Sequence, residues 1–226
     1  MIELYSFPTP NGQKVTILLE ELGLEYQIFP INIARGDQQI EEFLRISPNN
    51  RIPAIIDLQP LDGGKPIAIF ESGAILIYLA DKAGRFLSSD VRSRTLVTQW
   101  LMWQMGNLGP MLGQAHHFRK TTPEKIDYAI KRYTDEAARL YRVLEKQLSN
   151  YEFVAGKYSI ADMSIYPWIC YHEWQGQDLN DYLNVKRWFD GMAARPQVEK
   201  GMNVGKTLWG SEPINEEVRE KIRRIL

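Results

Sequence analysis

The sequence has almost no cysteine: its 226 residues include one, Cys170. A single cysteine excludes an internal disulfide and a Cys-x-x-Cys redox motif. Any thiol chemistry in which this protein takes part therefore needs either Cys170 or a thiol that is not part of the chain. Cys170 lies in an aromatic stretch, residues 166–174, where a lone cysteine most often serves as a small buried hydrophobic residue.

Long apolar runs and an excess of one charge sign are also missing. The longest apolar run, near residues 73–80, is far below the ~20 residues that a membrane-spanning helix needs. The formal net charge is −1, with 24% charged residues, so we expect no general attraction to nucleic acid or to acidic membranes. The first residues lack the charged and apolar segments of a secretory signal. We therefore expect a cytoplasmic protein that binds neither membranes nor nucleic acids.

The order of sequence patterns predicts two domains of different class. Up to residue 84, strand patterns and amphipathic helix patterns follow one another as β-α-β-α-β-β-α, the order of a thioredoxin-like domain. From residue 91 onward the strand patterns stop and long helical patterns take over. We predict a thioredoxin-like α/β domain over residues 1–84 and an all-helical domain over residues 91–226. The expected strands are 2–7, 26–33 and the two runs around Gly63-Gly64, and the expected helices of the second domain include 91–118, 123–148 and 185–194, with a peripheral helix or a partly disordered tail after Gly210.

One short stretch of the first domain predicts an anion site. The apolar run 67–70 is followed by Glu71-Ser72-Gly73 and then by an apolar helix pattern, 74–80. Serine is a favoured N-cap, and a helix N-terminus offers unpaired N–H groups and partial positive charge. A carboxylate or a phosphate is the ligand that such a helix start attracts. Taken alone, the pair also fits plain helix capping.

The step from Ile52 to Pro53, upstream of this helix, predicts a second element of the site. Proline cannot donate to a β-ladder, so Pro53 should stand at the start of a strand, where an Ile52-Pro53 cis bond is feasible. Such a bond would turn the backbone N–H and C=O of Ile52 outward, where an extended peptide could pair with them. The two elements together describe a site for a peptide carboxylate and a peptide backbone.

The turn after the first predicted strand is the candidate chemical centre. Thr9 and Asn11 both carry hydrogen-bond donors, and Asn11 is a natural N-cap for the next helix. The same residues would also form an ordinary turn anywhere. Tyr5 lies on the preceding strand and could be either a core residue or a catalytic one. His116 and His117 are adjacent on a helix and therefore point apart, so we predict no metal site.

These motifs resemble the glutathione transferases, and among them the nu class, whose members act as disulfide-bond oxidoreductases. The resemblance rests on Arg51-Ile52-Pro53-Ala54, on Glu71-Ser72-Gly73-Ala74-Ile75, on Pro8-Thr9-Pro10-Asn11-Gly12 and on Ser159-Ile160-Ala161-Asp162, which spread over most of the chain. It implies the glutathione transferase fold, a homodimer, and glutathione as the ligand, bound as two reduced molecules or as the oxidised form.

The resemblance also implies a role for each site residue. Ser72 would hold the γ-glutamyl carboxylate, Glu71 the ammonium group, and Ile52 with Pro53 the cysteinyl backbone. Arg132, on a second-domain helix, would hold a further carboxylate, and Gln38, or its neighbour Gln39, would contact the tripeptide.

Thr9 and Asn11 would stabilise the glutathione thiolate in this resemblance, and the helix start beside them would lower the thiol pKa. The implied activity is glutathione-dependent disulfide reduction by bound glutathione thiols rather than by a protein cysteine. The alternatives are conjugation of glutathione to electrophiles, reduction of hydroperoxides, and regulatory glutathione binding without turnover.

Overall fold

The structure, a computed structural model, describes residues 1–210, 212 and 214–225. The chain forms two compact units, one made of Met1–Arg85 with Pro196–Leu226 and the other of Phe86–Arg195. The sequence pattern assigned everything from residue 91 onward to one helical domain, whereas the structure groups Pro196–Leu226 with the first unit. Of that predicted domain, residues 211, 213 and 226 lie outside the described part of the chain.

The first unit is built on a four-stranded mixed sheet in the order β2-β1-β3-β4. β1 runs parallel to β2 and antiparallel to β3, which is also antiparallel to β4. In this register Tyr5 of β1 lies opposite Phe29 and Ala54. The sheet and its helices confirm the predicted thioredoxin-like class. The strands are β1 (Ile2–Ser6), β2 (Tyr26–Pro30), β3 (Ala54–Asp57) and β4 (Ile67–Phe70).

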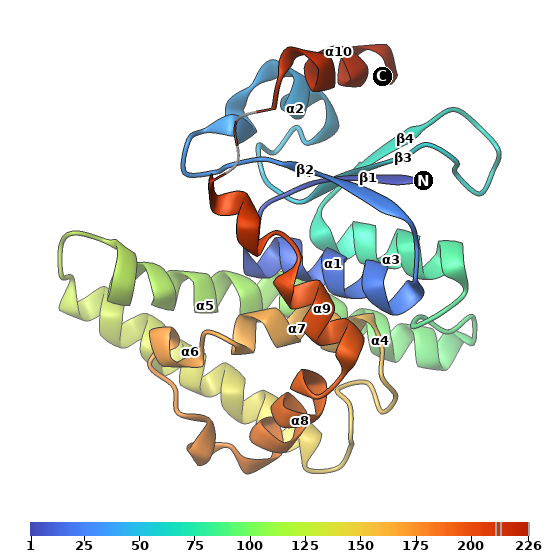
Figure 1. The fold of residues 1–226 in the computed structure, drawn as a ribbon. Helices are drawn as coiled ribbons and strands as arrows, with labels where there is room; N and C mark the ends of the chain where they lie inside the picture. The colour runs from blue at the N-terminus through green and yellow to red at the C-terminus, as the bar shows by residue number, and fades with distance from the viewer. Residues whose placement is uncertain (211, 213, 226) are drawn as a thin grey trace. The chain divides into compact units, whose positions relative to one another are not determined.

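Helices cover both faces of this sheet (Figure 1). α1 (Pro10–Leu22) and α3 (Ser72–Ala83) lie together on one face, and α2 (Glu41–Ile46) lies on the other. The sequence predicts one helix over residues 38–46, but the structure divides it into a 3₁₀ turn, Asp37–Gln39, and α2.

The chain returns to the first unit at α9 (Pro196–Asn203), which packs along α1. The two backbones are in direct contact, since a Cβ atom at Gly201 would stand 2.5 Å from the Cα of Ile17. The hydroxyl of Thr16 donates a hydrogen bond of 2.7 Å to the carbonyl oxygen of Gly201. This close packing explains why the residues after Pro196 belong to the first unit.

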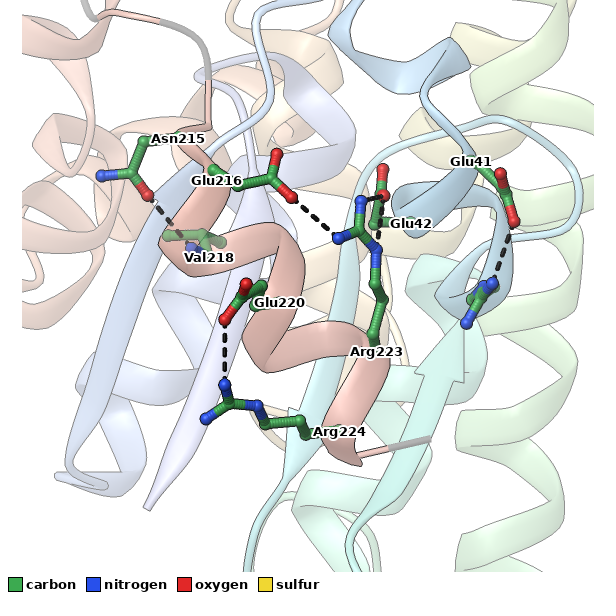
Figure 2. A network of polar contacts seen from close by, with 9 residues as sticks. Glu41, Glu42, Asn215, Glu216, Val218, Glu220, Arg223 and Arg224 are labelled. Atoms are coloured by element: carbon green, nitrogen blue, oxygen red, sulfur yellow. Dashed lines mark hydrogen bonds and ion pairs between the residues drawn. The ribbon is translucent and has the colours of Figure 1, made fainter.

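The last helix, α10 (Glu216–Ile225), packs against α2 (Figure 2). Ile222 is fully buried in the same apolar cluster as Tyr5 and Phe43. Arg223 donates a hydrogen bond of 2.9 Å from its Nε to Glu42 of α2 and also bonds to Glu216 of its own helix. The tail after Gly210, in its described residues, is therefore a helix docked on the core of the first unit.

The second unit is all-helical, as predicted. Within the single helix predicted over residues 91–118, a π-helical segment, Gln104–Leu108, separates two α-helices. None of the described helices combines the length and the apolar composition that a membrane span requires. The helices are α4 (Val91–Trp103), α5 (Gly109–His116), α6 (Asp127–Leu148), α7 (Ile160–Ile169) and α8 (Leu183–Ala193).

Ser159-x-x-Asp162 has the spacing that predicts a capping box, and the start of α7 forms one. The carboxylate of Asp162 is fully buried and accepts hydrogen bonds from the backbone N–H groups of Val154 and Ser159 and from the indole of Trp188. Burial raises the pKa of Asp162 to about 6 despite these donors. This one side chain joins the loop before α7, the start of α7 and helix α8.

Candidate functional site

A cavity of about 230 Å³ lies in the first unit, where the start of α1, the turn after α2 and the start of α3 meet. Its wall is mainly polar. Five residues predicted from the sequence line it: Asn11, Ile52, Pro53, Glu71 and Ser72. Three lining residues were not predicted as site residues, namely Ser47, Asn49 and Arg51.

The start of α3 forms one wall of the cavity. The N-cap is Glu71 rather than the predicted Ser72, which is the first helical residue. The first backbone bond of α3 runs from the N–H of Ile75 to the carbonyl of Glu71, so the amides of the first turn have no partner within the helix. The cavity therefore meets a serine hydroxyl and the positive end of a helix dipole.

The backbone of Glu71 adopts an unusual conformation, with φ 68° and ψ 115°. A non-glycine residue with positive φ typically carries a strain of about 1–3 kcal/mol, and such residues cluster at functional sites. The Glu71 carboxylate accepts a hydrogen bond of 3.5 Å from the Asn49 side chain, across the cavity rim. The conformation thus holds a carboxylate and the hydroxyl of Ser72 side by side.

The peptide bond between Ile52 and Pro53 is cis, as the sequence pattern suggested. The ladder of β3 begins only at Ala54, and the described part of the chain contains no hydrogen-bond partner for the backbone of Ile52. The turn before it is closed by Ser47, whose hydroxyl donates 2.7 Å to the carbonyl of Arg51 and accepts from the Arg51 N–H. Ile52 itself lines the cavity.

The turn at the start of α1 contributes Asn11 to the cavity wall but not Thr9. The predicted N-cap was Asn11, whereas the observed N-cap is Thr9, with Pro10 at the first helical position. Proline favours that position because its φ is already helical and it has no N–H to satisfy, so the cap falls on the residue before it. Gly12 permits the close approach of α1 to β1, since a Cβ there would lie 2.3 Å from the carbonyl oxygen of Phe7.

Lys14 is a further polar residue behind this wall, and no sequence pattern indicates its position there. Its side chain is fully buried on α1, and its Nζ donates a hydrogen bond of 3.4 Å to the hydroxyl of Ser72. Burial lowers the pKa of Lys14 to about 7, and the negative charge of Glu71 partly opposes this shift. A lysine is rarely buried, so sequence reasoning treats such a position as solvent-exposed.

Two residues with reactive side chains, Tyr5 and Cys170, do not line the cavity. Tyr5 is fully buried, stacks on Phe29 and donates a hydrogen bond of 2.9 Å to Glu3, which makes it a core residue. Cys170 lies in the second unit at the end of α7, where burial raises the pKa of its thiol to about 11. A thiol with that pKa is a poor nucleophile near neutral pH.

Arg132 and Gln38 do not line this cavity. Arg132 is exposed on α6 in the second unit, where it lines a separate hollow of about 730 Å³ with Lys131, Arg139 and other residues. Gln38 is half-buried in the 3₁₀ turn before α2, and its Oε1 is shielded from solvent without a hydrogen-bond partner among the described residues. Gln39 is exposed.

One of the two adjacent histidines, His116, belongs to an aromatic cluster of the second unit. His116 packs against the rings of Tyr171 and Trp174, and burial lowers its pKa. Within the described residues, no group of three or more His, Cys, Asp or Glu side chains is arranged to hold a metal ion.

Comparison with known proteins identifies relatives that match most of the chain. Disulfide-bond oxidoreductase YfcG of Escherichia coli (strain K12) is 52% identical over 197 residues, which cover 87% of this chain and 92% of that protein. A glutathione transferase family member from Pseudomonas fluorescens pf-5, with two glutathione bound, has a TM-score of 0.84 and 44% identity over 89% of this chain and 92% of that one.

A glutathione transferase from Pseudomonas putida, with one glutathione disulfide bound per subunit, has a TM-score of 0.85 and 40% identity and covers 90% of this chain and 91% of that one. Two family models match as well: the glutathione S-transferase N-terminal domain over residues 1–81 and the glutathione S-transferase C-terminal domain over residues 108–196. The chain belongs to the glutathione S-transferase family.

Proposed function

We propose that this protein is a glutathione-dependent disulfide-bond oxidoreductase in which glutathione supplies the reacting thiols. The observation that carries the proposal is the state of the only cysteine. Cys170 has a raised pKa and lies in the second unit, whereas the polar cavity of the first unit contains no cysteine. The relative YfcG is named a disulfide-bond oxidoreductase, and the two solved structures hold two glutathione molecules or one glutathione disulfide.

The residues of the cavity fit the γ-glutamyl end of glutathione. This end is a zwitterion, with a carboxylate and an ammonium group on one carbon. Ser72 and the positive end of the α3 helix dipole suit the carboxylate, and the adjacent Glu71 suits the ammonium group. The unpaired backbone of Ile52 suits the cysteinyl peptide, in the manner of an added β-strand.

Asn11 is the lining residue best suited to hold the thiolate, because its amide donates hydrogen bonds and it lies in the first turn of α1. When bound, glutathione as thiolate attacks the substrate disulfide and releases one substrate thiol, and a second glutathione resolves the mixed disulfide to give glutathione disulfide and the other thiol. Asn11 favours the thiolate form in this scheme, and the backbone carbonyl of Thr9, the N-cap residue, accepts the hydrogen bond from Gln13 that opens α1.

Side-by-side rate measurements test this function against its alternatives. The substrates are a small model disulfide, an aryl halide and a hydroperoxide, each supplied with reduced glutathione. We expect kcat/KM to be largest for the disulfide. A larger value for the aryl halide would indicate a conventional S-transferase. Glutathione binding without turnover of any of the three would indicate a regulatory binding protein.

The roles of Arg132 and Gln38 as contacts to the tripeptide remain proposals, as do a homodimer and a cytoplasmic location. Light scattering of the purified protein and cell fractionation test the last two. For Arg132 the test is the glutathione affinity of Arg132→Ala, with the exposed Lys131→Ala on the same helix as its control.

A further inference from the structure

Lys14 lies directly behind the residue that forms the anion-binding wall of the cavity. Its Nζ is 3.4 Å from the hydroxyl of Ser72, and its side chain is 1% exposed. Ser72 itself lines the cavity, whereas Lys14 does not. Any charge on Lys14 therefore acts on a ligand through Ser72 and across a short, water-poor path, where electrostatic interactions are strong.

We propose that Lys14 is a positioning residue for the ligand carboxylate, and that binding of this carboxylate at Ser72 is coupled to protonation of Lys14. This inference rests on the proposed glutathione site and adds that Lys14 takes up a proton when the ligand binds there. In the protonated state, the ammonium group donates to the Ser72 hydroxyl, which leaves the hydroxyl hydrogen directed at the carboxylate. The proton comes from solvent, and no bond other than N–H is formed.

The charged groups around Lys14 support this coupling. α3 and α9 pack on α1. At the start of α3, Glu71 favours the protonated amine, and the amine is neutral to a large extent above pH 7 because burial outweighs that charge. At the far end of α3, Lys82 pairs with Asp57, and on α9 Lys200 pairs with Glu20. Asp81 and Glu199 also lie on these two helices, towards the end of α3 and on α9 respectively.

A bound γ-glutamyl group adds two opposite charges to this environment. Its ammonium group would sit at Glu71, and its carboxylate would sit at Ser72, the residue that Lys14 contacts. The carboxylate is thus the closer of the two charges, and it raises the pKa of Lys14 in the complex. With a free pKa of about 7, the binding reaction should take up close to one proton at pH 8 and almost none at pH 6.

Calorimetry with S-methylglutathione tests the linkage, since the blocked thiol of this probe cannot release a proton. Titrations in two buffers of different ionisation enthalpy give the number of protons taken up at each pH. For the unmodified protein we expect uptake near one proton at pH 8, and a Kd roughly tenfold larger at pH 8 than at pH 6. Lys14→Met should lose both effects, and the exposed Lys65→Met on the same unit should keep both.

The outcomes separate this inference from the proposed function. Binding with the same affinity at both pH values and without proton uptake would overturn the role of Lys14 and leave the glutathione site standing. Failure of the unmodified protein to bind the probe at either pH would contradict the proposed function itself, and the inference with it. If Lys14→Met does not fold, the proton uptake of the unmodified protein decides the question alone.

Discussion

Arg223 of α10 donates a hydrogen bond of 2.9 Å to Glu42 of α2, a residue 181 positions earlier in the chain. Backbone hydrogen bonding and Arg223 lower the pKa of Glu42, although burial of its carboxyl group acts in the opposite direction. The end of α2 leads into the turn that begins at Ser47 and lines the cavity. The C-terminal helix, through the Arg223–Glu42 contact that Figure 2 shows, thereby holds the helix that precedes this turn.

Arg223→Ala should therefore loosen α2. We expect faster amide hydrogen exchange in residues 41–46, measured by mass spectrometry, because α2 is short and loses an interaction with α10. Arg224→Ala is the matched control, since Arg224 pairs with Glu220 inside its own helix. Unchanged exchange in α2 of the Arg223 variant would show that α10 does not stabilise it.

The Ser72 hydroxyl should contribute strongly to glutathione affinity. Ser72→Ala removes a donor to a carboxylate, an interaction worth about 1.5–3 kcal/mol, so we expect Kd to rise roughly ten- to hundredfold in calorimetry. The exposed Ser89→Ala serves as the control. An unchanged Kd in Ser72→Ala would exclude this hydroxyl from the site.

Asn11 should set the pH dependence of the rate. Without its amide, the bound thiol should return toward its free pKa of about 8.5, so the rising limb of the pH–rate profile of Asn11→Ala should move to higher pH. Thr9→Ala should shift it less, because Thr9 does not line the cavity.

Asn49→Ala is the control for this experiment, because Asn49 lines the same cavity and contacts Glu71 instead. We expect it to change affinity without moving the profile. If Asn11→Ala and Thr9→Ala, alone or combined, leave the limb in place, the thiolate is stabilised by other groups.

Asp162→Asn should destabilise the second unit. Both oxygens of its carboxylate accept hydrogen bonds from buried donors. The amide of asparagine would place its two N–H donors against the donors of Ser159. Each buried polar group left without a partner costs about 1–3 kcal/mol. Urea unfolding measures the loss, with the exposed N-cap variant Asp90→Asn as control.

The pH dependence of this stability has a definite sign. Because the folded-state pKa of Asp162 is raised from 3.8 to about 6, the native state binds its proton more tightly than the unfolded chain does. The tighter proton binding of the native state therefore adds to the free energy of unfolding, fully below pH 3.8, and this contribution is lost as the pH rises through about 6. Asp162→Asn should flatten that part of the stability profile, and an equal slope in both proteins would contradict the assignment.

The sequence predicted the parts of the fold that depend on local patterns. The alternating strands, the turn at Gly63-Gly64 and the Ser159–Asp162 capping box each specify a structure within a few residues. The cap positions were less accurate for a local reason: Pro10 moves the N-cap of α1 to Thr9, and the positive φ of Glu71 makes Ser72 the first residue of α3.

These local patterns do not predict long-range packing. The docking of α10 depends on the burial of Ile222 in a core formed by residues near the other end of the chain. The apolar spacing within α10 predicts that one face is buried, but it does not predict which element covers that face. The burial of Lys14 has the same origin, because it results from the meeting of α1 with the start of α3. Ser47, Asn49 and Arg51 line the cavity because the turn in which they lie meets the start of α3, and this meeting is again a long-range contact.

The proposed function requires that the reacting sulfur belongs to glutathione and not to Cys170, and Cys170→Ser tests this most directly. The measurement is kcat/KM for glutathione-dependent reduction of a small model disulfide, compared between this variant and the unmodified protein. Since burial raises the pKa of the Cys170 thiol and no cysteine lines the cavity, the two values should agree within about twofold. A folded Cys170→Ser protein that binds glutathione but has lost disulfide reduction would contradict the account.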